Sequence, residues 1–550
     1  MFDRVESYFA LRSVAIGPDV NGVPRMLLNG RPVFQFGPLD QGWWPDGLYT
    51  APTDSALRFD LEITKKLGFN LVRKHVKVEP ERWYYHCDRI GLLVWQDMPS
   101  GDANAPWPVD STELKRSNES AEIYDRELKA LIESRRNCPC IIAWVPFNEA
   151  WGQFDTVRVT RLVRELDPHR LVISASGGND FGVGDIRDIH FYPQPESTPA
   201  ERNRAVVLGE YGGLGLPLSG HTWQDQKNWG YRRFQSREEL ADVYLKYIEA
   251  LRPMIESRLS AVVYTQTTDV EIETNGLMTY DRDVLKFDAA KLAEAHAKLY
   301  EPLRKLSDAE KSAAYTLAYW RFEEGKPGDL VLHDRQKRDG RAAIDTSGNR
   351  NHLYAYSDRN APRNSSDVPA AVVPRLGLAN SGSLDDSASG DGATRDLYTD
   401  HGRSGTHMNA LATYPLTEWT IELSVKPKVV GKKQSLIGKD GKPAGGPEAP
   451  LQVQLREDGR LAVSFVDAGG AARSVATRNP LPLDQWQHLA ARCDGKRVEL
   501  LRVVSGKYES EGTTACDGGL TLSVGTWTIG RGFHDGRIGL DGQAVLDEIR

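Results

Sequence analysis

Two glutamates, Glu149 and Glu210, each follow an apolar run of the sequence and could carry acid–base and nucleophilic chemistry. Glu149 lies near the end of IIAWVPFNEAWG, and Glu210 lies near the end of AVVLGEYGG. A pair of carboxyl groups, one protonated and one ionised, hydrolyses a glycosidic bond with retention when the groups are about 5–5.5 Å apart. Their separation of 61 positions in the sequence (210 − 149) cannot supply that distance. A fold that brings the two strand ends together must set the distance between the carboxyl groups.

Five further polar side chains stand where other apolar runs end, and they are candidates for the same site. They are Arg73, Asp97, Asn148, His190 and Tyr192. The histidines His75, His86 and His190 raise the alternative of a metal site. None of them has a carboxylate or a second histidine at ligand spacing on one helix face. We therefore expect neither a catalytic metal nor another cofactor.

The elements that must position these residues are eight short apolar runs, which alternate with helical patterns between about residues 30 and 300. Several runs are rich in β-branched and aromatic residues without polar alternation, which is typical of strands buried on both faces. Eight such strands predict a (β/α)8 barrel, whose functional residues lie at the carboxyl ends of the strands. An open doubly wound sheet is the alternative, but no glycine-rich dinucleotide fingerprint follows the first strand. The predicted strands cover residues 32–37, 69–76, 91–98, 140–147, 171–177, 186–193, 205–212 and 259–266.

From about residue 314 the pattern changes to short alternating runs, separated by loops rich in Gly, Asp, Ser and Asn. Examples are WTIELSVKP at 419–427 and KRVELLRVV at 496–504. This alternation is typical of antiparallel strands with one buried face, so we predict an all-β sandwich. Cys493 and Cys516 both fall in this region. A disulfide between them is left open, and it would suit an oxidising compartment.

Composition and charge exclude some classes of partner. The chain has 550 residues, too many for one hydrophobic core, so two or three domains are expected. Its formal net charge is −7 and it has no long basic run. Nucleic acid and an anionic membrane surface are therefore not expected as partners. No stretch of about 18 or more apolar residues occurs, so we expect no membrane span.

The motifs around the two glutamates resemble those of glycoside hydrolase family 2, a family of retaining glycosidases with a (β/α)8 barrel. WVPFNEAWG is similar to the family's acid/base signature, an Asn-Glu pair after strand four. VLGEYGG is similar to its nucleophile signature after strand seven. The stretch NLVRKHVKVEPERWYYHCDRIGLLVWQDMP resembles the region from strand two to strand three. The resemblance covers about residues 8–300.

The resemblance implies a double displacement with a defined role for each motif residue. Glu149 would protonate the leaving oxygen and later deprotonate water, while Glu210 would form the glycosyl–enzyme bond. Asn148 would hydrogen-bond the 2-hydroxyl group of the sugar, a contact that strengthens in the transition state.

Four more residues are expected to support the site or to touch the substrate. By the resemblance, Tyr192 would donate a hydrogen bond to the nucleophile, and Arg73 would help to keep it ionised by its charge. His190 and Asp97 would line the same wall. Packing at the barrel mouth is the alternative role for Arg73 and Tyr192.

Departures from the family's pattern leave the sugar open. After the strand-two arginine the run is Lys74-His75-Val76-Lys77, where many family members have Ser-His-Tyr-Pro. Trp43 and Trp44 could stack on a sugar face, with packing under a loop as an equal alternative. After strand eight, three side chains could touch substrate or make ordinary loop contacts, namely Gln266, Asp269 and Glu271.

The C-terminal region resembles a laminin-G-like sandwich of the concanavalin A type. AYWRFEEG, WQHLAARCDGKRVELL and the closing LDGQAVLDEIR carry this resemblance. Such modules often bind glycans, so carbohydrate binding and structural packing are both open for this one. The expected boundaries are 1–25 for the end of an immunoglobulin-like domain or a linker, 26–305 for the barrel, 306–313 for a linker and 314–550 for the sandwich.

These features predict a multidomain protein, a (β/α)8 TIM barrel followed by a concanavalin A-like jelly roll, that acts on an oligo- or polysaccharide. The favoured function is a retaining exo-β-glycosidase, with β-galactosidase as the default and β-mannosidase or β-glucuronidase as runners-up. An inactive barrel in a carbohydrate-binding protein and an endo-acting hydrolase of the same clan are the alternatives. We expect the chain to be a fragment without its front domains and the full-length protein to be periplasmic or secreted, although residues 1–13 do not resemble a signal peptide.

Overall fold

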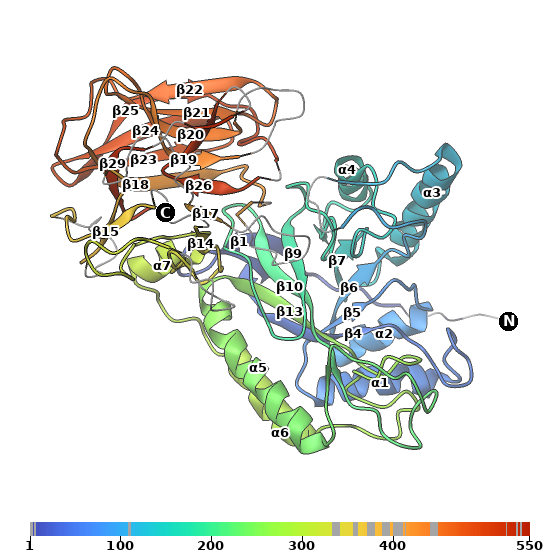
Figure 1. Cartoon of the computed structure of the whole chain (residues 1–550). Coiled ribbons are helices and arrows are strands. Elements are labelled where there is room, and N and C mark those ends of the chain that lie inside the picture. The colour runs from blue at the N-terminus through green and yellow to red at the C-terminus, as the bar shows by residue number, and fades with distance from the viewer. Residues whose placement is uncertain are drawn as a thin grey trace. The chain divides into compact units, whose positions relative to one another are not determined.

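The computed structural model of the chain forms two compact units, Met1–Ser307 and Asp308–Arg550 (Figure 1). None of the described helices combines the length and apolarity needed to span a membrane. The structure describes residues 4, 7–107, 112–332, 341–355, 361–370, 380–387, 397–399, 411–412, 414–440, 449–523, 525–534, 537–539 and 542–550.

The first unit is built around a curved sheet of eight parallel strands, and all eight predicted strands are present. They are β4 (Gln35–Asp40), β5 (Leu71–Lys74), β6 (Leu93–Asp97), β7 (Ile141–Val145), β8 (Leu171–Val172), β9 (Ile186–Phe191), β10 (Ala205–Gly212) and β13 (Leu259–Thr265). Their spatial order is β8-β7-β6-β5-β4-β13-β10-β9, so the sheet forms a near-closed barrel in which β8 and β9 are not paired with each other. The strands are buried almost throughout, as their continuous apolar runs predict.

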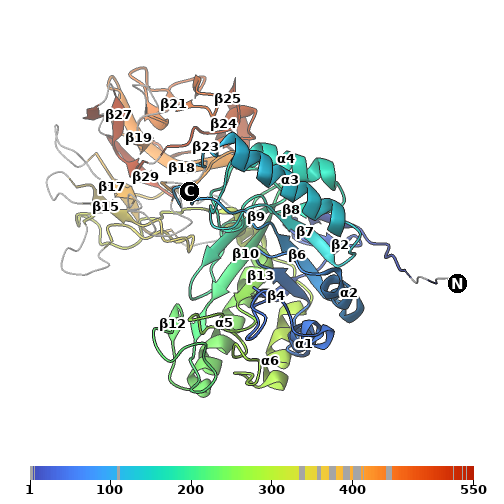
Figure 2. The same cartoon turned by 90° about the vertical axis from the view of Figure 1, so that its right-hand side faces the viewer.

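Six helices connect the barrel strands and cover them from outside (Figure 2). Each follows a predicted strand, and the bounds are α1 (Asp54–Lys66), α2 (Glu81–Ile90), α3 (Asn118–Arg135), α4 (Thr156–Leu166), α5 (Arg237–Ser257) and α6 (Ala289–Ala297), which a 3-10 turn at Lys298–Tyr300 extends. In α4 the buried side chains include Val159 and Val163, four residues apart on one face. The connections from β8 to β9 and from β9 to β10 are fully described and contain no helix, so the alternation is less regular than predicted.

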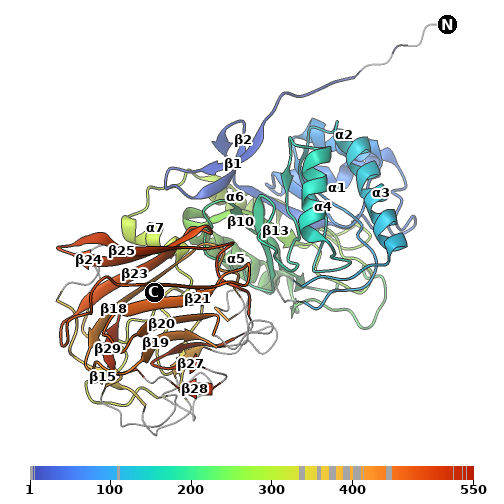
Figure 3. The ribbon, with the colours of Figure 1, turned by 90° about the horizontal axis from the view of Figure 1, so that it is seen from above.

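A small antiparallel sheet precedes the barrel. Its strands are β1 (Val14–Pro18), β2 (Pro24–Leu28) and β3 (Arg31–Pro32). Strand β2 contacts β10 and β13, and Figure 3 shows β1 and β2 next to β10. Arg25 donates to the backbone oxygen of Leu259, the first residue of β13, at 2.5 Å. This sheet therefore lies at the amino-terminal end of the barrel strands, away from the end where functional residues are expected.

The second unit is a sandwich of two antiparallel seven-stranded sheets, which follow helix α7 (Asp308–Tyr315). One sheet has the order β14 (Leu353–Tyr354), β17 (Leu397–Thr399), β26 (Trp527–Ile529), β19 (Gln434–Lys439), β20 (Leu451–Leu455), β21 (Leu461–Val466) and β22 (Ala472–Ala476). The other has the order β15 (Arg363–Ser365), β16 (Ser383–Asp385), β29 (Ala544–Asp547), β18 (Trp419–Pro427), β23 (Gln487–Cys493), β24 (Arg497–Val504) and β25 (Lys507–Ala515). Two short pairs complete the chain, β27 (Gly532–His534) with β28 (Arg537–Gly539) in this unit and β11 (Leu214–Gly215) with β12 (Arg232–Arg233) in the first.

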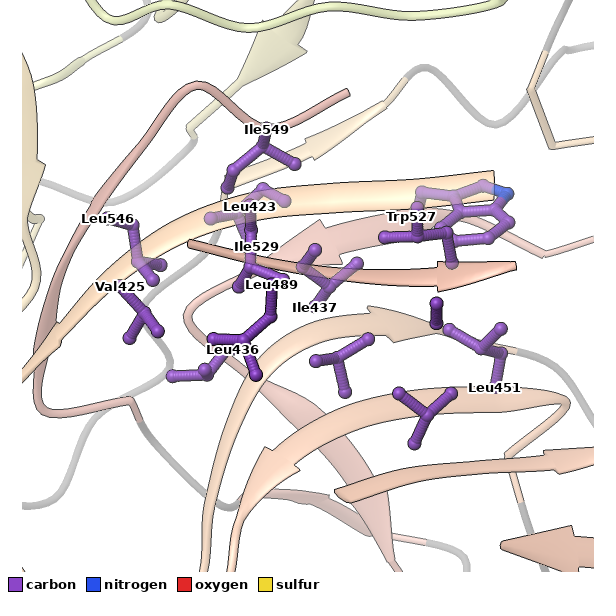
Figure 4. Close-up of a cluster of buried hydrophobic side chains, with 14 of the residues drawn as sticks. Leu423, Val425, Leu436, Ile437, Leu451, Leu489, Trp527, Ile529, Leu546 and Ile549 are labelled. Carbon is purple, nitrogen blue, oxygen red and sulfur yellow. The ribbon is translucent and has the colours of Figure 1, made fainter. Parts of the chain in front are cut away.

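The core of the sandwich is made by apolar side chains from both sheets. Leu423 and Val425 of β18 belong to the same buried cluster as Leu436 and Ile437 of β19, which lies in the opposite sheet (Figure 4). Packing of two inner sheet faces in this way is the arrangement expected of a β-sandwich. The predicted all-β sandwich is confirmed.

Cys493 and Cys516 lie side by side in the sandwich. They are buried free thiols, and their sulfur atoms are 3.6 Å apart. A disulfide needs about 2.05 Å between its sulfurs, so a small movement of the two side chains would join them.

We expect a mild oxidant to form this disulfide and to raise the free energy of unfolding of the sandwich by about 2–4 kcal/mol. Thiol titration, peptide mass spectrometry and urea unfolding before and after oxidation would measure the change. Cys493→Ser is the control and should show no gain in stability. Thiols that remain free after oxidation would contradict the prediction.

Candidate active site

Glu149 and Glu210 meet at the carboxyl-terminal end of the barrel strands. Glu210 lies on β10, and Glu149 follows the end of β7. One carboxylate oxygen of each lies within 4.8 Å of the other and of a ring nitrogen of His190. Glu210 is 6% exposed, whereas the Glu149 side chain is 37% exposed. The two carboxyl groups are therefore close enough to act on one bound molecule from a buried and a more open position.

The backbone at Glu149 has an uncommon conformation. Glu149 and Ala150 have φ values of 49° and 59°, in the left-handed region that non-glycine residues seldom adopt. The amide of Glu149 donates to the backbone oxygen of Ser176 at 2.9 Å, which ties the turn to the loop after β8. Backbone strain held in place by neighbouring bonds is a feature of functional sites, and here it aims the Glu149 side chain.

Glu210 is held by one hydrogen-bond donor on each carboxylate oxygen. The hydroxyl of Tyr192 donates to Oε2 at 2.7 Å, and Nη1 of Arg73 donates to Oε1 at 3.2 Å. The Tyr192 hydroxyl is also 2.7 Å from the hydroxyl of Thr265 at the end of β13. Burial, together with the charge of Glu210, raises the pKa of Tyr192 well above its ordinary value, so this group stays a donor. Both donors fix the orientation of the Glu210 carboxyl group.

Arg73 bonds several groups at the base of the site and has no exposed surface. It forms a two-pronged ion pair with Asp97 at 3.1 and 3.0 Å and donates to the side-chain oxygen of Asn148 at 2.7 Å. Burial would raise the pKa of Asp97, but the charge of Arg73 outweighs it and holds that pKa below its usual value. Arg73 and Asp97 therefore act on a ligand through Asn148 and Glu210, because neither reaches the solvent-facing surface.

His190 lies between the two glutamates. Its Nδ1 is 2.9 Å from Oε1 of Glu149 and 3.4 Å from Oε2 of Glu210. Burial would lower the pKa of His190, but the carboxylates of Glu210, Glu149 and Asp188 outweigh it and raise that pKa. Burial would likewise raise the pKa of Glu149, but the hydrogen bond and charge of His190, with the charges of His75 and Arg73, lower it. Each group thus stabilises the charged form of the other, the carboxylate of Glu149 and the protonated ring of His190.

Ser176 and Asp188 hold the Nε2 side of the His190 ring, and the sequence analysis did not identify them. Nε2 of His190 is 2.8 Å from the Ser176 hydroxyl, which donates to Asp188 at 2.5 Å. Burial raises the pKa of Asp188. The ring also packs on Gly177, where a Cβ atom would come within 2.2 Å of it. Asp188 is buried inside a strand, and that is why sequence alone gave no signal for it.

Tyr231 is a second residue that the sequence reasoning missed. Its ring is stacked on Tyr192, with centroids 3.7 Å apart and an interplanar angle of 3°, and it is 47% exposed. Burial and the charges of Glu149, Glu210 and Glu273 raise its pKa, so it lies near all three carboxyl groups. The cluster of aromatic residues in NWGYRRF (228–234), within the long connection after β10, was the available signal.

The two tryptophans predicted to stack on a sugar are placed differently from each other. Trp44 is buried, and the guanidinium of Arg282 lies 3.9 Å from the centroid of its ring, so its surroundings favour the packing alternative. Trp43 is half-buried and packs edge-to-face with the exposed Tyr49 at 5.1 Å.

The residues predicted after strand eight make mostly structural contacts. Burial raises the pKa of Asp269 to about 6, and Asp269 forms a buried ion pair with Lys286 at 2.7 Å. Gln266 is buried and bonds the side chain of Asn275 at 3.0 Å. Glu271 is exposed. The carboxyl group of this segment that faces the site is Glu273, whose pKa burial and the charges of Glu210 and Glu149 raise to about 7.

Glu149, His190 and Glu210 also form the group of described residues whose spacing could hold a metal ion. Their hydrogen bonds to one another and to Tyr192 already account for that spacing. His75 pairs instead with Asp97 at 3.1 Å, and His86 pairs with Asp54 at 2.9 Å.

Two family models match the chain. Residues 25–285 match the TIM barrel domain of glycosyl hydrolases family 2, and residues 400–550 match the concanavalin A-like lectin/glucanase superfamily in its laminin G form. The first match covers all eight barrel strands and includes Arg73, Asn148, Glu149, His190, Tyr192 and Glu210.

Individual similar proteins carry glycosidase names. A β-galactosidase of Vibrio cholerae is 27% identical over 200 residues, which are 34% of this chain and 19% of that protein. A family 2 β-galacturonidase of Eisenbergiella tayi, bound to glycerol, has 18% identity and a TM-score of 0.41 over 54% of this chain and 56% of its own. A β-glucuronidase of Bifidobacterium dentium has 19% identity and a TM-score of 0.41 over 52% of this chain and 50% of its own. The chain therefore spans about a fifth of the length of the β-galactosidase that it matches.

Each of the two matched regions falls within one of the two compact units of the structure. The chain carries a glycosyl hydrolase family 2 TIM barrel domain, followed by a concanavalin A-like domain of the laminin G type.

Proposed function

We propose that this chain is the catalytic part of a retaining exo-β-glycosidase, with Glu149 as acid/base and Glu210 as nucleophile. The observation that carries the proposal is the separation of at most 4.8 Å between a carboxylate oxygen of Glu149 and one of Glu210. Carboxyl pairs of retaining enzymes lie about 5–5.5 Å apart, whereas inverting enzymes leave about 6.5–9.5 Å for a water molecule.

In the first step Glu210 attacks the anomeric carbon while Glu149 protonates the departing oxygen. Tyr192 and Arg73 hold Glu210 ionised and aimed before the attack. Arg73 donates to the oxygen of the Asn148 amide, which leaves the amide nitrogen to donate to the sugar 2-hydroxyl. The proton for the leaving group is held in the Glu149–His190 pair, along the 2.9 Å contact between Oε1 and Nδ1.

In the second step Glu149, now ionised, takes a proton from a water molecule, and the water oxygen attacks the anomeric carbon of the glycosyl–enzyme. Glu210 leaves as a carboxylate and regains its two donors. Two inversions at the anomeric carbon give net retention. Tyr231, half-exposed beside the carboxyl groups, offers a flat aromatic face for the sugar ring.

A panel of 4-nitrophenyl β-glycosides tests this function. We expect turnover of at least one sugar, with the β anomer as the first product in a proton NMR time course. Glu149→Ala should lower kcat/KM by about 10²–10⁴-fold on these substrates, because protonation of the leaving oxygen is lost. The loss should be much smaller on 2,4-dinitrophenyl glycosides, whose leaving group needs no proton.

The exposed Glu165 of α4 supplies the control, and Glu165→Ala should keep full activity. A first product with the α configuration would refute retention. No turnover by any variant, also after fusion to front domains, would favour an inactive barrel in a carbohydrate-binding protein.

We also propose that the substrate is an oligo- or polysaccharide, that the concanavalin A-like domain contributes carbohydrate binding, and that the full-length protein acts in the periplasm or outside the cell. The adjacent thiols of Cys493 and Cys516 support the last point, since an oxidising compartment would let them form a bond.

A further inference from the structure

Glu273 places a third carboxyl group beside the acid–nucleophile pair, and the proposed chemistry does not use it. Burial raises its pKa to about 7, and the charges of Glu210 and Glu149 add to the shift. Glu273 also raises the pKa of Tyr231, the half-exposed aromatic residue of the site. Glu273 follows the carboxyl-terminal end of β13 and its backbone pairs with Trp229, whose ring packs on Tyr231, so it lies at the same end of the barrel as the reacting groups.

The position of Glu273 is fixed by backbone and side-chain bonds. Its segment pairs with Trp229, whose amide donates to the backbone oxygen of Ile272 at 2.8 Å, and the amide of Thr274 donates back to the oxygen of Trp229 at 2.9 Å. Trp229 packs edge-to-face on Tyr231 at 5.4 Å. Backbone pairing and ring packing thus hold Glu273, Trp229 and Tyr231 in fixed positions relative to one another.

A chain of amide side chains orients the Glu273 carboxylate. Gln41 donates to Gln266 at 2.8 Å, Gln266 donates to Asn275 at 3.0 Å, and Asn275 donates to Oε1 of Glu273 at 2.8 Å. These three hydrogen bonds connect the residue after β4 to the loop after β13. Within the described part of the chain, Oε2 of Glu273 has no hydrogen-bond donor of its own, so this oxygen is the acceptor that remains for a ligand.

Three basic groups near Glu149 already have acidic partners. The cations that act most strongly on Glu149 are His190, His75 and Arg73. His190 pairs with Glu149 at 2.9 Å, His75 pairs with Asp97 at 3.1 Å, and Arg73 pairs with Asp97 and Glu210. A carboxylate at C6 of the sugar would therefore meet Glu273 and Glu210 with none of these three groups free to balance its charge, and like charges at such contacts are strongly unfavourable.

We propose that Glu273 is a specificity residue that accepts hydroxyl hydrogen bonds from the bound sugar, and that the site takes neutral β-hexosides and rejects the corresponding uronides. This inference rests on the proposed function, since it concerns the sugar held between Glu149 and Glu210.

Matched pairs of substrates that differ only at C6 test the inference. We expect kcat/KM for 4-nitrophenyl β-galactoside or β-glucoside to exceed that of the galacturonide or glucuronide by on the order of 100-fold or more. Glu273→Gln keeps the shape but removes the charge, so it should narrow this ratio at least tenfold. Glu271→Gln, two residues away and exposed, should leave the ratio unchanged. A wild type that prefers a uronide, or a ratio that Glu273→Gln does not alter, would overturn the proposal.

The dependence of the ratio on pH separates a role in specificity from a structural one. Because the pKa of Glu273 is about 7, the preference for the neutral sugar should grow as the pH rises through 7. Glu210, Glu149 and His75 face Glu273 and are the same in both reactions, so their effects largely cancel in the ratio. The Glu273→Gln variant should show no such growth, and a wild-type ratio that stays flat across this range would count against the proposal.

Binding experiments keep the inference testable if no glycoside is turned over, a result that would refute the proposed function alone. Galactose and galacturonate, or glucose and glucuronate, would then be titrated into the wild type and into Glu273→Gln by calorimetry or ligand-detected NMR. Tighter binding of the neutral sugar by the wild type, and a smaller difference in the variant, would support the inference. Tighter binding of the uronate would overturn it.

Discussion

Glu210→Ala is expected to lower kcat by at least about 10⁴-fold, because removal of a covalent nucleophile leaves only binding and electrostatic contributions. The side chain is 6% exposed, so its removal leaves a small space beside the anomeric carbon. Added azide should enter that space and restore turnover. The product should be the glycosyl azide of inverted configuration, since only one displacement occurs.

The same experiment on Glu149→Ala assigns the two roles. Azide attacking the glycosyl–enzyme bond of that variant should give a glycosyl azide of retained configuration, because Glu210 still acts first. Product configuration by proton NMR is the measurement. The exposed Glu294 of α6 supplies the control, and Glu294→Ala should behave as the wild type. A glycosyl azide of inverted configuration from Glu149→Ala would mean that the two roles are exchanged. Full activity of Glu210→Ala would refute the mechanism.

The eight barrel strands could be predicted because each is a continuous apolar run that needs burial on both faces. Their carboxyl ends then define one rim, so the polar residues that end the runs are brought together by topology alone. Arg73, Asn148 and Glu210 follow this rule, and Arg73 donates a hydrogen bond to each of the other two. The two connections without helices could not be foreseen, since helix packing is a property of the closed barrel and not of the local sequence.

The residues missed in the site belong to two kinds of position. Asp188 is a charged residue inside a buried strand, where its role appears only from its contacts with Ser176 and the amide of Gly209. Tyr231 and Glu273 lie in the long connections after β10 and β13, which have no periodicity to read. The sequence reasoning selected Glu271 in place of Glu273. Glu273 is the less exposed of the two and lies where the backbone folds back to pair with Trp229.

Arg73→Met is expected to cost about 3–5 kcal/mol of stability in the barrel unit, because it leaves a buried carboxylate without its partner. Asp97 is fully buried and receives two hydrogen bonds from Arg73. The variant keeps roughly the volume of the side chain but removes every donor. Urea unfolding followed by hydrogen exchange of peptides from β5 and β6 would measure the loss, with peptides of the sandwich as the internal reference.

Two comparisons separate the buried pair from a general effect of charge. Arg82 pairs with Asp54 at the surface, with side chains 58% and 50% exposed, so Arg82→Met should change stability little. The double variant Arg73→Met/Asp97→Leu should recover part of the loss, because the buried Asp97 carboxylate is gone while Glu210 keeps its hydrogen bond from Tyr192. An equal loss in Arg82→Met, or no recovery in the double variant, would show that the cost does not come from the buried carboxylate.

The stability lost in Arg73→Met should depend on pH, and the direction in which the pKa of Asp97 is shifted tells how. Since Arg73 holds the pKa of Asp97 below its usual value of about 3.9 in the folded protein, the stabilisation is complete above that value. It is lost as the pH falls through the lower folded-state pKa. The difference in stability between the wild type and Arg73→Met should therefore be constant near neutral pH and shrink in acid. A difference that grows in acid would mean that Arg73 stabilises the barrel through contacts other than its ion pair with Asp97.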